Sequence, residues 1–208
     1  MNPIKVLTVD DHPILREGIA AIIENHADIV LVGEAGNGRE AIECFRKLHP
    51  DVTLMDLVMP EMNGIDATVA IRKEFPNARI VVLTTYKGDV QAAQALDAGA
   101  CGYLLKSTLR KDLLDTIRSV HVGRRRIPPE IAMAMAEHHS SDTLSERELE
   151  VLEQIAAGNA NKNIAEHLSI AEDTVKGHVK AILAKLGAND RTHAVTIALK
   201  RGIISLEE

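Results

Sequence analysis

The sequence predicts an α/β domain built on a doubly wound, five-stranded parallel sheet, followed by a small all-α domain of four helices. Three observations support this prediction. In roughly the first 120 residues, short aliphatic runs alternate with segments whose apolar residues recur at helical spacing. After residue 143, by contrast, the sequence contains no strand-like run. The length of 208 residues also suits two small domains, which we place at residues 1–121 and 143–208, with a linker at residues 122–142.

Five short apolar segments are the strand candidates of the first domain. Because each is apolar on both faces, the strands should lie in a parallel sheet that helices cover on both sides. The segments between them carry apolar residues at helical spacing, which gives five βα units. The candidates are Lys5–Val9, Ile29–Gly33, Val52–Met55, Ile80–Leu83 and Gly102–Leu105.

The sequence changes character after the last of these units. From His121 to Asp142 it is rich in arginine, proline, histidine and serine, which predicts a linker with one helix at Pro129–Glu137. Four helices follow. Ser145 and Glu148 form a capping box at the start of the first, which Gly158 ends. The others are Asn161–Leu168, Glu172–Leu186 and a segment from Asp190 to Lys200.

Composition excludes several classes of protein. Hydrophobic residues make up 46% of the chain and charged residues 26%, which excludes an intrinsically disordered protein. The longest aliphatic runs are far shorter than the roughly 20 apolar residues that span a bilayer, so we expect no membrane segment. The first residues lack a secretory-signal pattern, which predicts a cytoplasmic protein. Cys44 and Cys101 lack metal or disulfide spacing, and we expect both to stay reduced in the core.

Polar side chains follow four of the predicted strands at the point where each ends. Since the carboxyl ends of parallel strands share one edge of a sheet, these side chains should converge there. They are Asp10, Asp11, Asp56, Thr84 and Lys106. Crowded carboxylates repel one another, and Mg²⁺ is the cation that best suits such an oxygen site. A lysine and a hydroxyl suit phosphoryl oxygens, so Asp56 is the candidate nucleophile that forms an acyl phosphate.

Four motifs at this edge resemble the receiver domain of bacterial two-component response regulators, which has a flavodoxin-like fold. They are Val9–His12, Met55–Gly64, Leu83–Thr85 and Tyr103–Lys106, within a match that covers residues 4–121. The resemblance implies that a histidine kinase phosphorylates Asp56, that Thr84 and Lys106 contact the phosphoryl group, and that Tyr103 is an aromatic switch. It further implies a Mg²⁺ site made by Asp10, Asp11, Asp56 and the backbone carbonyl of Val58. His12 follows the acidic pair, and we expect it to be a surface residue near the pocket.

The predicted helix Glu172–Leu186 has two contrasting faces. Val175, Val179, Ile182 and Leu186 form an apolar stripe, whereas Lys176 and Lys180 lie opposite it. A short helix, a tight turn and a second helix with a basic face predict a helix-turn-helix motif that enters the major groove of DNA. A solvated lysine face is the alternative. The last hundred residues lack aromatic rings, which disfavours single-stranded nucleic acid or RNA.

The second domain resembles the LuxR-type DNA-binding domain, and the whole chain the NarL/FixJ class of response regulators. The resemblance lies in Leu144–Leu152, Ala157–Gly158, Asn161–Lys162, Ile164–Ala165, Thr174–Val179, Lys185–Leu186 and Asp190–Val195. It implies groove-facing Lys176, Gly177 and Lys180, and backbone-contacting Thr174, Asn161, Lys162 and Lys185. It also implies that the last helix pairs two copies on DNA. Ala171 replaces the usual cap, for which Ser169 with Glu172 offers a shifted capping box.

These features predict a transcription regulator that aspartyl phosphorylation switches, not an enzyme, with slow self-dephosphorylation as its only catalysis. The expected partners are a histidine kinase, double-stranded DNA and a second copy of the chain, with RNA polymerase as a candidate partner. Two alternatives remain open. One is a constitutive DNA-binding regulator whose unphosphorylated receiver serves in dimerisation. The other is a Mg²⁺-dependent phosphohydrolase, which would need a second acid where Val58 stands.

Overall fold

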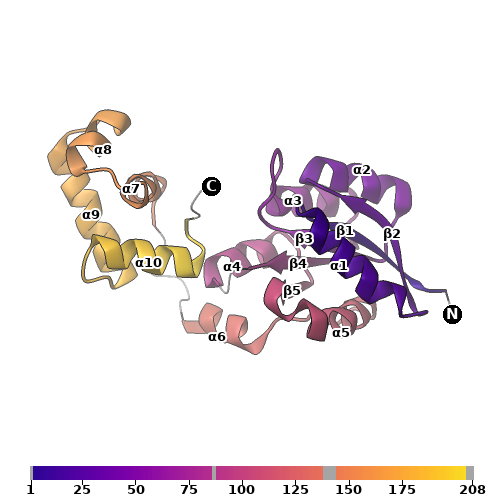
Figure 1. Cartoon of the computed structure of the whole chain (residues 1–208). Coiled ribbons are helices and arrows are strands. Elements are labelled where there is room, and N and C mark those ends of the chain that lie inside the picture. The colour runs from indigo at the N-terminus through magenta and orange to yellow at the C-terminus, as the bar shows by residue number, and fades with distance from the viewer. Residues whose placement is uncertain (1, 86–87, 138–143, 205–208) are drawn as a thin grey trace. The chain divides into compact units, whose positions relative to one another are not determined.

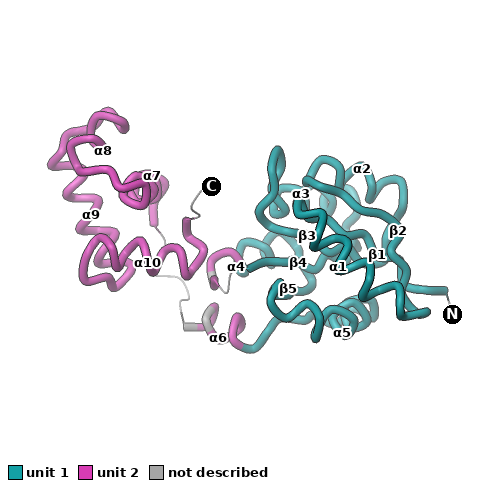
Figure 2. The backbone as a smooth tube through the Cα atoms, in the orientation of Figure 1, with its two compact units in different colours: residues 1–85, 92–129 teal, residues 86–91, 130–208 magenta. Residues whose placement is uncertain are grey.

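The computed structural model describes residues 2–85, 88–137 and 144–204. The chain folds into two compact units, one made of residues 1–85 and 92–129 and the other of residues 86–91 and 130–208 (Figure 2). The end of the predicted linker, residues 138–142, lies outside the described residues. In the part of the chain that the structure describes, every helix is too short or too polar to cross a lipid bilayer.

The first unit contains a five-stranded parallel sheet with the strand order β2-β1-β3-β4-β5 (Figure 1). Its strands are β1 (Ile4–Val9), β2 (Ile29–Ala35), β3 (Val52–Asp56), β4 (Ile80–Thr84) and β5 (Gly102–Leu105). The direction of winding reverses between β1 and β3, where Val9 pairs with Met55. Doubly wound sheets bind ligands at such a reversal, outside the carboxyl ends of the strands. The predicted fold of this unit is confirmed.

Helices cover both faces of the sheet, because successive strand residues point to opposite sides. Val6 and Leu54 pack with α1 and α5 on one face, whereas Leu7 and Met55 pack with α2 and α3 on the other. Figure 1 shows the helices on the two sides of the sheet. The two cysteines are free and half-buried. The helices of this part of the chain are α1 (Pro13–Glu24), α2 (Gly38–Leu48), α3 (Gly64–Glu74), α4 (Asp89–Asp97) and α5 (Leu109–His121), with a short 3₁₀ helix η1 (Lys106–Thr108).

The chain returns to the sheet after α5. The backbone N–H of Arg126 donates to the Cys101 carbonyl at 3.1 Å, and the Arg126 carbonyl accepts from the Tyr103 N–H at 2.8 Å. The side chains of Arg124–Arg126 are exposed, as a solvated linker predicts, but the backbone pairing was not predicted. The start of the predicted linker therefore forms an isolated bridge with the outer edge of β5. The helix α6 (Pro129–Glu137) follows, with the predicted bounds.

Four helices surround the core of the second unit, as predicted. They are α7 (Glu146–Ala156), α8 (Asn161–Leu168), α9 (Glu172–Leu186) and α10 (Arg191–Arg201). The capping box of Ser145 and Glu148 is present at the start of α7. The shifted capping box at α9 is wrong, because Ala171 caps that helix without a side-chain hydrogen bond. Ser169 instead ends α8 in the left-handed conformation, with φ of 53°, so its side chain is not at the start of α9.

Candidate functional site

Three carboxylates meet where the winding of the sheet reverses. Asp10 and Asp11 follow β1 directly, and Asp56 is the last residue of β3. Asp10 is fully buried and Asp56 is 3% exposed, whereas the side chain of Asp11 is 32% exposed. Buried carboxylates are unfavourable unless cations or hydrogen-bond donors compensate them. Two backbone donors contribute here, since His12 N–H donates to Asp10 Oδ1 at 2.9 Å and Leu57 N–H to Asp56 Oδ1 at 2.8 Å.

Lys106 joins two of these carboxylates. Its Nζ lies 2.7 Å from Asp10 Oδ2 and 2.8 Å from Asp56 Oδ2, so one ammonium group bridges the ends of β1 and β3. Burial raises the pKa of Asp56 to about 6, although the hydrogen bond and the charge of Lys106 oppose the rise. Burial alone would lower the pKa of Lys106, but the two carboxylates outweigh it and raise that pKa. Asp56 is therefore a buried acid beside a cation that can also bind phosphoryl oxygens.

Thr84 and Tyr103 lie on the two neighbouring strands. Thr84 ends β4, beside the pairing of Asp56 with Leu83, and is 2% exposed. Tyr103 lies in β5 and is 1% exposed, and a hydrogen bond joins the two side chains. Burial raises the pKa of Tyr103 to about 12, while the hydrogen bond with Thr84 acts in the opposite direction. The hydroxyl predicted to contact a phosphoryl group is thus bonded to the predicted aromatic switch.

The acidic side chains fit a divalent cation. Asp10, Asp11, His12 and Asp56 each offer a ligand atom, and these atoms all lie within 4.8 Å of one another. Asp11 Oδ1 is buried, and His12 Nδ1 lies 2.8 Å from it. Several carboxylate oxygens together are the ligand set that Mg²⁺ prefers. Val58 lies two residues after Asp56 with its side chain 53% exposed, and the role of its carbonyl remains a prediction.

The second unit presents the predicted nucleic-acid surface. Val175, Ile182 and Leu186 are buried in the core, so the opposite side of α9 faces solvent. The exposed residues there are Thr174, Lys176, Gly177 and Lys180. Lys162 is exposed and Asn161 half-buried at the start of α8. The helix pair therefore leaves open the face that the sequence assigns to DNA, and the contacts of these residues with DNA remain predictions.

Two of the predicted DNA contacts are engaged within the unit. Lys176 pairs with Asp173 at 2.9 Å and with Glu172 at 3.6 Å, all on the exposed surface. Lys185 lies 2.7 Å from Oε2 of Glu148, which is only 6% exposed and belongs to the capping box of α7. Lys185 therefore connects α9 to the start of α7, a structural role that the sequence did not predict.

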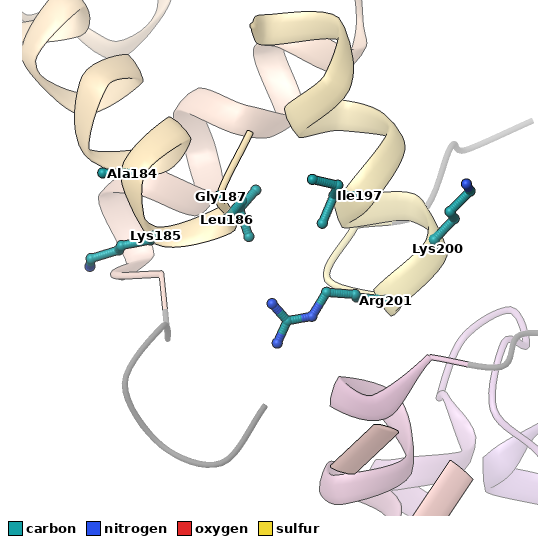
Figure 3. Close-up of a pocket in the computed structure, with 7 residues that line it drawn as sticks. All are labelled: Ala184, Lys185, Leu186, Gly187, Ile197, Lys200 and Arg201. Atoms are coloured by element: carbon teal, nitrogen blue, oxygen red, sulfur yellow. The ribbon is translucent and has the colours of Figure 1, made fainter. Parts of the chain in front are cut away.

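A pocket of about 450 Å³ lies between the end of α9 and α10 (Figure 3). It is lined by Ala184, Lys185, Leu186, Gly187, Ile197, Lys200 and Arg201. Figure 3 shows the side chains of Lys200 and Arg201 extending from the end of α10 and Ile197 on the same helix. The predicted pairing helix thus has an apolar side chain next to basic ones.

Comparison with known proteins agrees with both halves of this description. Residues 6–118 match the family described as response regulator receiver domain, and residues 142–198 match the bacterial regulatory proteins of the luxR family. This chain belongs to the response regulator family. It carries a receiver domain and a LuxR-type DNA-binding domain, the combination of a phosphorylation-regulated transcription regulator.

Individual relatives align with this response regulator over almost its whole length. It is 41% identical to the response regulator protein VraR of Staphylococcus aureus, in an alignment that covers 97% of this chain and 99% of that protein. The solved structure of the response regulator ChrA, from a heme-sensing two-component system, is 35% identical with a TM-score of 0.59, covering 98% and 100% of the two chains. The RcsB–DNA complex has a TM-score of 0.69 at 27% identity, covering 96% and 99%.

Two residues that position the acidic pocket of the response regulator were missed in the sequence. Arg16 Nη1 donates to the Asp10 carbonyl at 2.6 Å, while its Nε donates to Glu34 at 3.0 Å, so the arginine fixes the backbone at the end of β1. Gly64 begins α3 against β3, where a Cβ atom would lie 1.8 Å from the Asp56 carbonyl oxygen. In the sequence, Gly64 was marked only by its place at the end of the Asp56 motif. Arg16 was marked only by being a basic residue early in α1.

Proposed function

We propose that Asp56 of this response regulator accepts a phosphoryl group from a histidine kinase, and that phosphorylation controls DNA binding by the second domain. The observation that carries the proposal is the contact of Lys106 Nζ with Asp56 Oδ2 at 2.8 Å, at the reversal point of the sheet. It places a buried nucleophile next to a cation suited to the incoming group. The receiver would comprise residues 1–121, the linker residues 122–142 and the DNA-binding domain residues 143–208.

The phosphoryl transfer needs little from the protein besides positioning and charge. An Asp56 carboxylate oxygen forms a bond to phosphorus while the bond between phosphorus and the kinase imidazole nitrogen breaks, and that nitrogen keeps the electron pair. The product on Asp56 is an acyl phosphate. Asp10, Asp11, Asp56 and the Val58 carbonyl would hold Mg²⁺, which supplies positive charge to the developing phosphoryl oxygens. Lys106 would pair with a phosphoryl oxygen in place of one carboxylate contact.

Phosphorylation would also change the hydrogen bond between Thr84 and Tyr103. A threonine hydroxyl has one proton, so once it donates to a phosphoryl oxygen on Asp56 it can only accept a hydrogen bond from Tyr103. The Thr84 hydroxyl would turn toward β3, and the Tyr103 side chain would reorient in response. The Tyr103 N–H donates to Arg126, so a change at this residue reaches the backbone that leads out of the receiver.

The second domain supplies the output. Its exposed α9 face suits the major groove of double-stranded DNA, and a homodimer would read two half-sites about one turn of duplex apart. The relative RcsB has been solved in complex with DNA, which supports this assignment. Since its target would be bacterial DNA, we place the protein in the cytoplasm. RNA polymerase is a candidate partner, and slow self-dephosphorylation would end the signal.

Intact-mass spectrometry tests the phosphoacceptor. The full chain is incubated with Mg²⁺ and acetyl phosphate as the wild type, as Asp56→Asn, and as the control Asp115→Asn, whose carboxylate is 72% exposed on α5. We expect one added phosphoryl group in the wild type and the control and none in Asp56→Asn. Modification of Asp56→Asn, or none of the wild type alongside a receiver that is modified, would refute the assignment. Equal DNA affinity with and without phosphorylation would favour the constitutive regulator.

A further inference from the structure

His12 lies closer to the acidic pocket than a surface residue needs to. It caps α1 with extended backbone (φ −91°, ψ 106°), and its side chain makes no capping hydrogen bond. The side chain is 68% exposed, yet its Nδ1 atom lies 3.1 Å from Asp10 Oδ1 and 2.8 Å from Asp11 Oδ1. An exposed imidazole has free access to water. Here its nitrogen is directed back toward two carboxylates.

Hydrogen bonding alone does not account for this arrangement. Nδ1 carries at most one proton, which it would have to share between the two oxygens. Asp10 Oδ1 already accepts the His12 N–H at 2.9 Å, and Asp11 Oδ1 is buried beside Nδ1. One ring proton between two carboxylates leaves most of their negative charge uncompensated. The three atoms therefore leave a need for positive charge that the imidazole proton does not meet.

The spacing of these atoms suits a shared cation. Ligands on adjacent corners of an octahedron with bonds of about 2.1 Å lie about 3 Å apart, and His12 Nδ1 lies 2.8 and 3.1 Å from its two oxygen neighbours. Lys106 contacts the other oxygen of Asp10, Oδ2, and so does not occupy the side that faces His12. Nitrogen and oxygen donors thus meet on the free side of Asp10.

We propose that His12 Nδ1 is a ligand of the divalent cation bound at Asp10 and Asp11. The inference rests on the proposed cation site and adds a nitrogen donor to its oxygens. Imidazole contributes more to the binding of Ni²⁺ and Mn²⁺ than of Mg²⁺, because affinity for nitrogen ligands rises along the first transition series. His12 therefore determines which metal the pocket selects, and it makes the pocket a site for transition-metal ions as well as Mg²⁺.

Calorimetric titration of the full chain with MgCl₂, MnCl₂ and NiCl₂ measures this selectivity. His12→Gln removes the nitrogen ligand, and the matched control His26→Gln removes an imidazole before β2, at the opposite edge of the sheet. We expect His12→Gln to weaken Ni²⁺ binding roughly tenfold and Mn²⁺ binding several-fold, with Mg²⁺ affinity changed less than about twofold. The control should match the wild type. Equal losses for all three ions, or none for Ni²⁺, would overturn the proposal.

Pulsed electron paramagnetic resonance of bound Mn²⁺ identifies the ligand directly. Coupling to a ¹⁴N nucleus should appear in the wild type and in His26→Gln and be absent in His12→Gln. Wild type without that coupling would refute a role for His12. Phosphorylation of Asp56 in Mg²⁺ distinguishes this result from a failure of the proposed function. If the chain is phosphorylated but the nitrogen coupling is absent, the proposed function stands and only the role of His12 is refuted. Mn²⁺ binding unchanged in Asp11→Asn would refute the cation site itself.

Discussion

Replacing Asp56 by asparagine should stabilise the first unit at neutral pH. The pKa of Asp56 is about 6 in the folded chain, raised by burial from 3.8. Well below pH 3.8 the carboxyl is protonated in both the folded and unfolded states and has no effect on stability. As the pH rises toward and through 6, the folded chain must ionise a buried group that the unfolded chain ionises in water, so stability falls. Asparagine cannot ionise and avoids this loss.

The magnitude follows from the pKa difference. One pKa unit corresponds to roughly 1.4 kcal/mol, so a shift from 3.8 to about 6 costs the wild type about 3 kcal/mol at pH 7. At pH 4 the cost is only about half a kcal/mol, because most of the Asp56 titration in the folded state lies above that pH. The advantage of Asp56→Asn should therefore be large at pH 7 and nearly vanish at pH 4.

Urea unfolding followed by tyrosine fluorescence measures this difference. The chain has no tryptophan, and Tyr103 lies in β5, so the unfolding of the first unit changes the tyrosine signal. The measurement is made in EDTA, since a bound cation would stabilise the wild type by mass action. The control is Asp115→Asn, whose carboxylate is 72% exposed and should change stability by less than about 0.5 kcal/mol. Equal stability of Asp56→Asn and wild type at pH 7, or an equal advantage at both pH values, would refute the reasoning.

Four further predictions concern single side chains. Lys106→Met leaves the Asp10 and Asp56 carboxylates without their shared cation, and in EDTA it should cost the first unit about 3 kcal/mol by the same fluorescence assay. Glu148→Gln weakens the contacts with Lys185 and with the start of α7, and should cost the second unit about 2 kcal/mol in scanning calorimetry. Gly177→Ala should stabilise the second unit by about 1 kcal/mol in the same measurement, since nothing lies within 4 Å of the added Cβ. Lys180→Ala should reduce the slope of log affinity against log salt by about one in DNA-binding titrations, and an unchanged slope would exclude a phosphate contact.

Most helix and strand bounds were predicted closely because they depend on residues that are neighbours in the sequence. The strands β3, β4 and β5 are buried on both faces, and their aliphatic runs therefore mark their ends within one residue, as at Ile80–Thr84. The capping box of Ser145 and Glu148 was also predicted correctly, because both residues lie within four positions of each other in the sequence. The exception is the start of α9, where hydrogen bonds were expected from Ser169 and the structure uses that residue to end α8.

The acidic pocket was predictable for a different reason. Each of its residues follows a strand, and parallel strands bring their ends together whatever the details of packing. Contacts between distant surfaces could not be predicted in this way. Lys185 was assigned to DNA by the resemblance to LuxR-type domains, whereas the Glu148 carboxylate, 37 residues earlier, accepts from its ammonium group at 2.7 Å. Likewise, no local pattern places the backbone of Arg126 beside β5.

The pairing of Arg126 with β5 also covers part of a sheet edge to which another chain could otherwise bind. The strand β5 ends the sheet, and an uncovered edge offers unpaired N–H and C=O groups to any other extended chain. Residues after α5 cover part of this edge, with Arg126 bonded to Cys101 and Tyr103. A proteolytic fragment that ends at His121 would expose it and should form aggregates, whereas one that ends at Pro128 would keep the cover. The cover over the β5 edge thus explains why the first compact unit continues past α5 to residue 129.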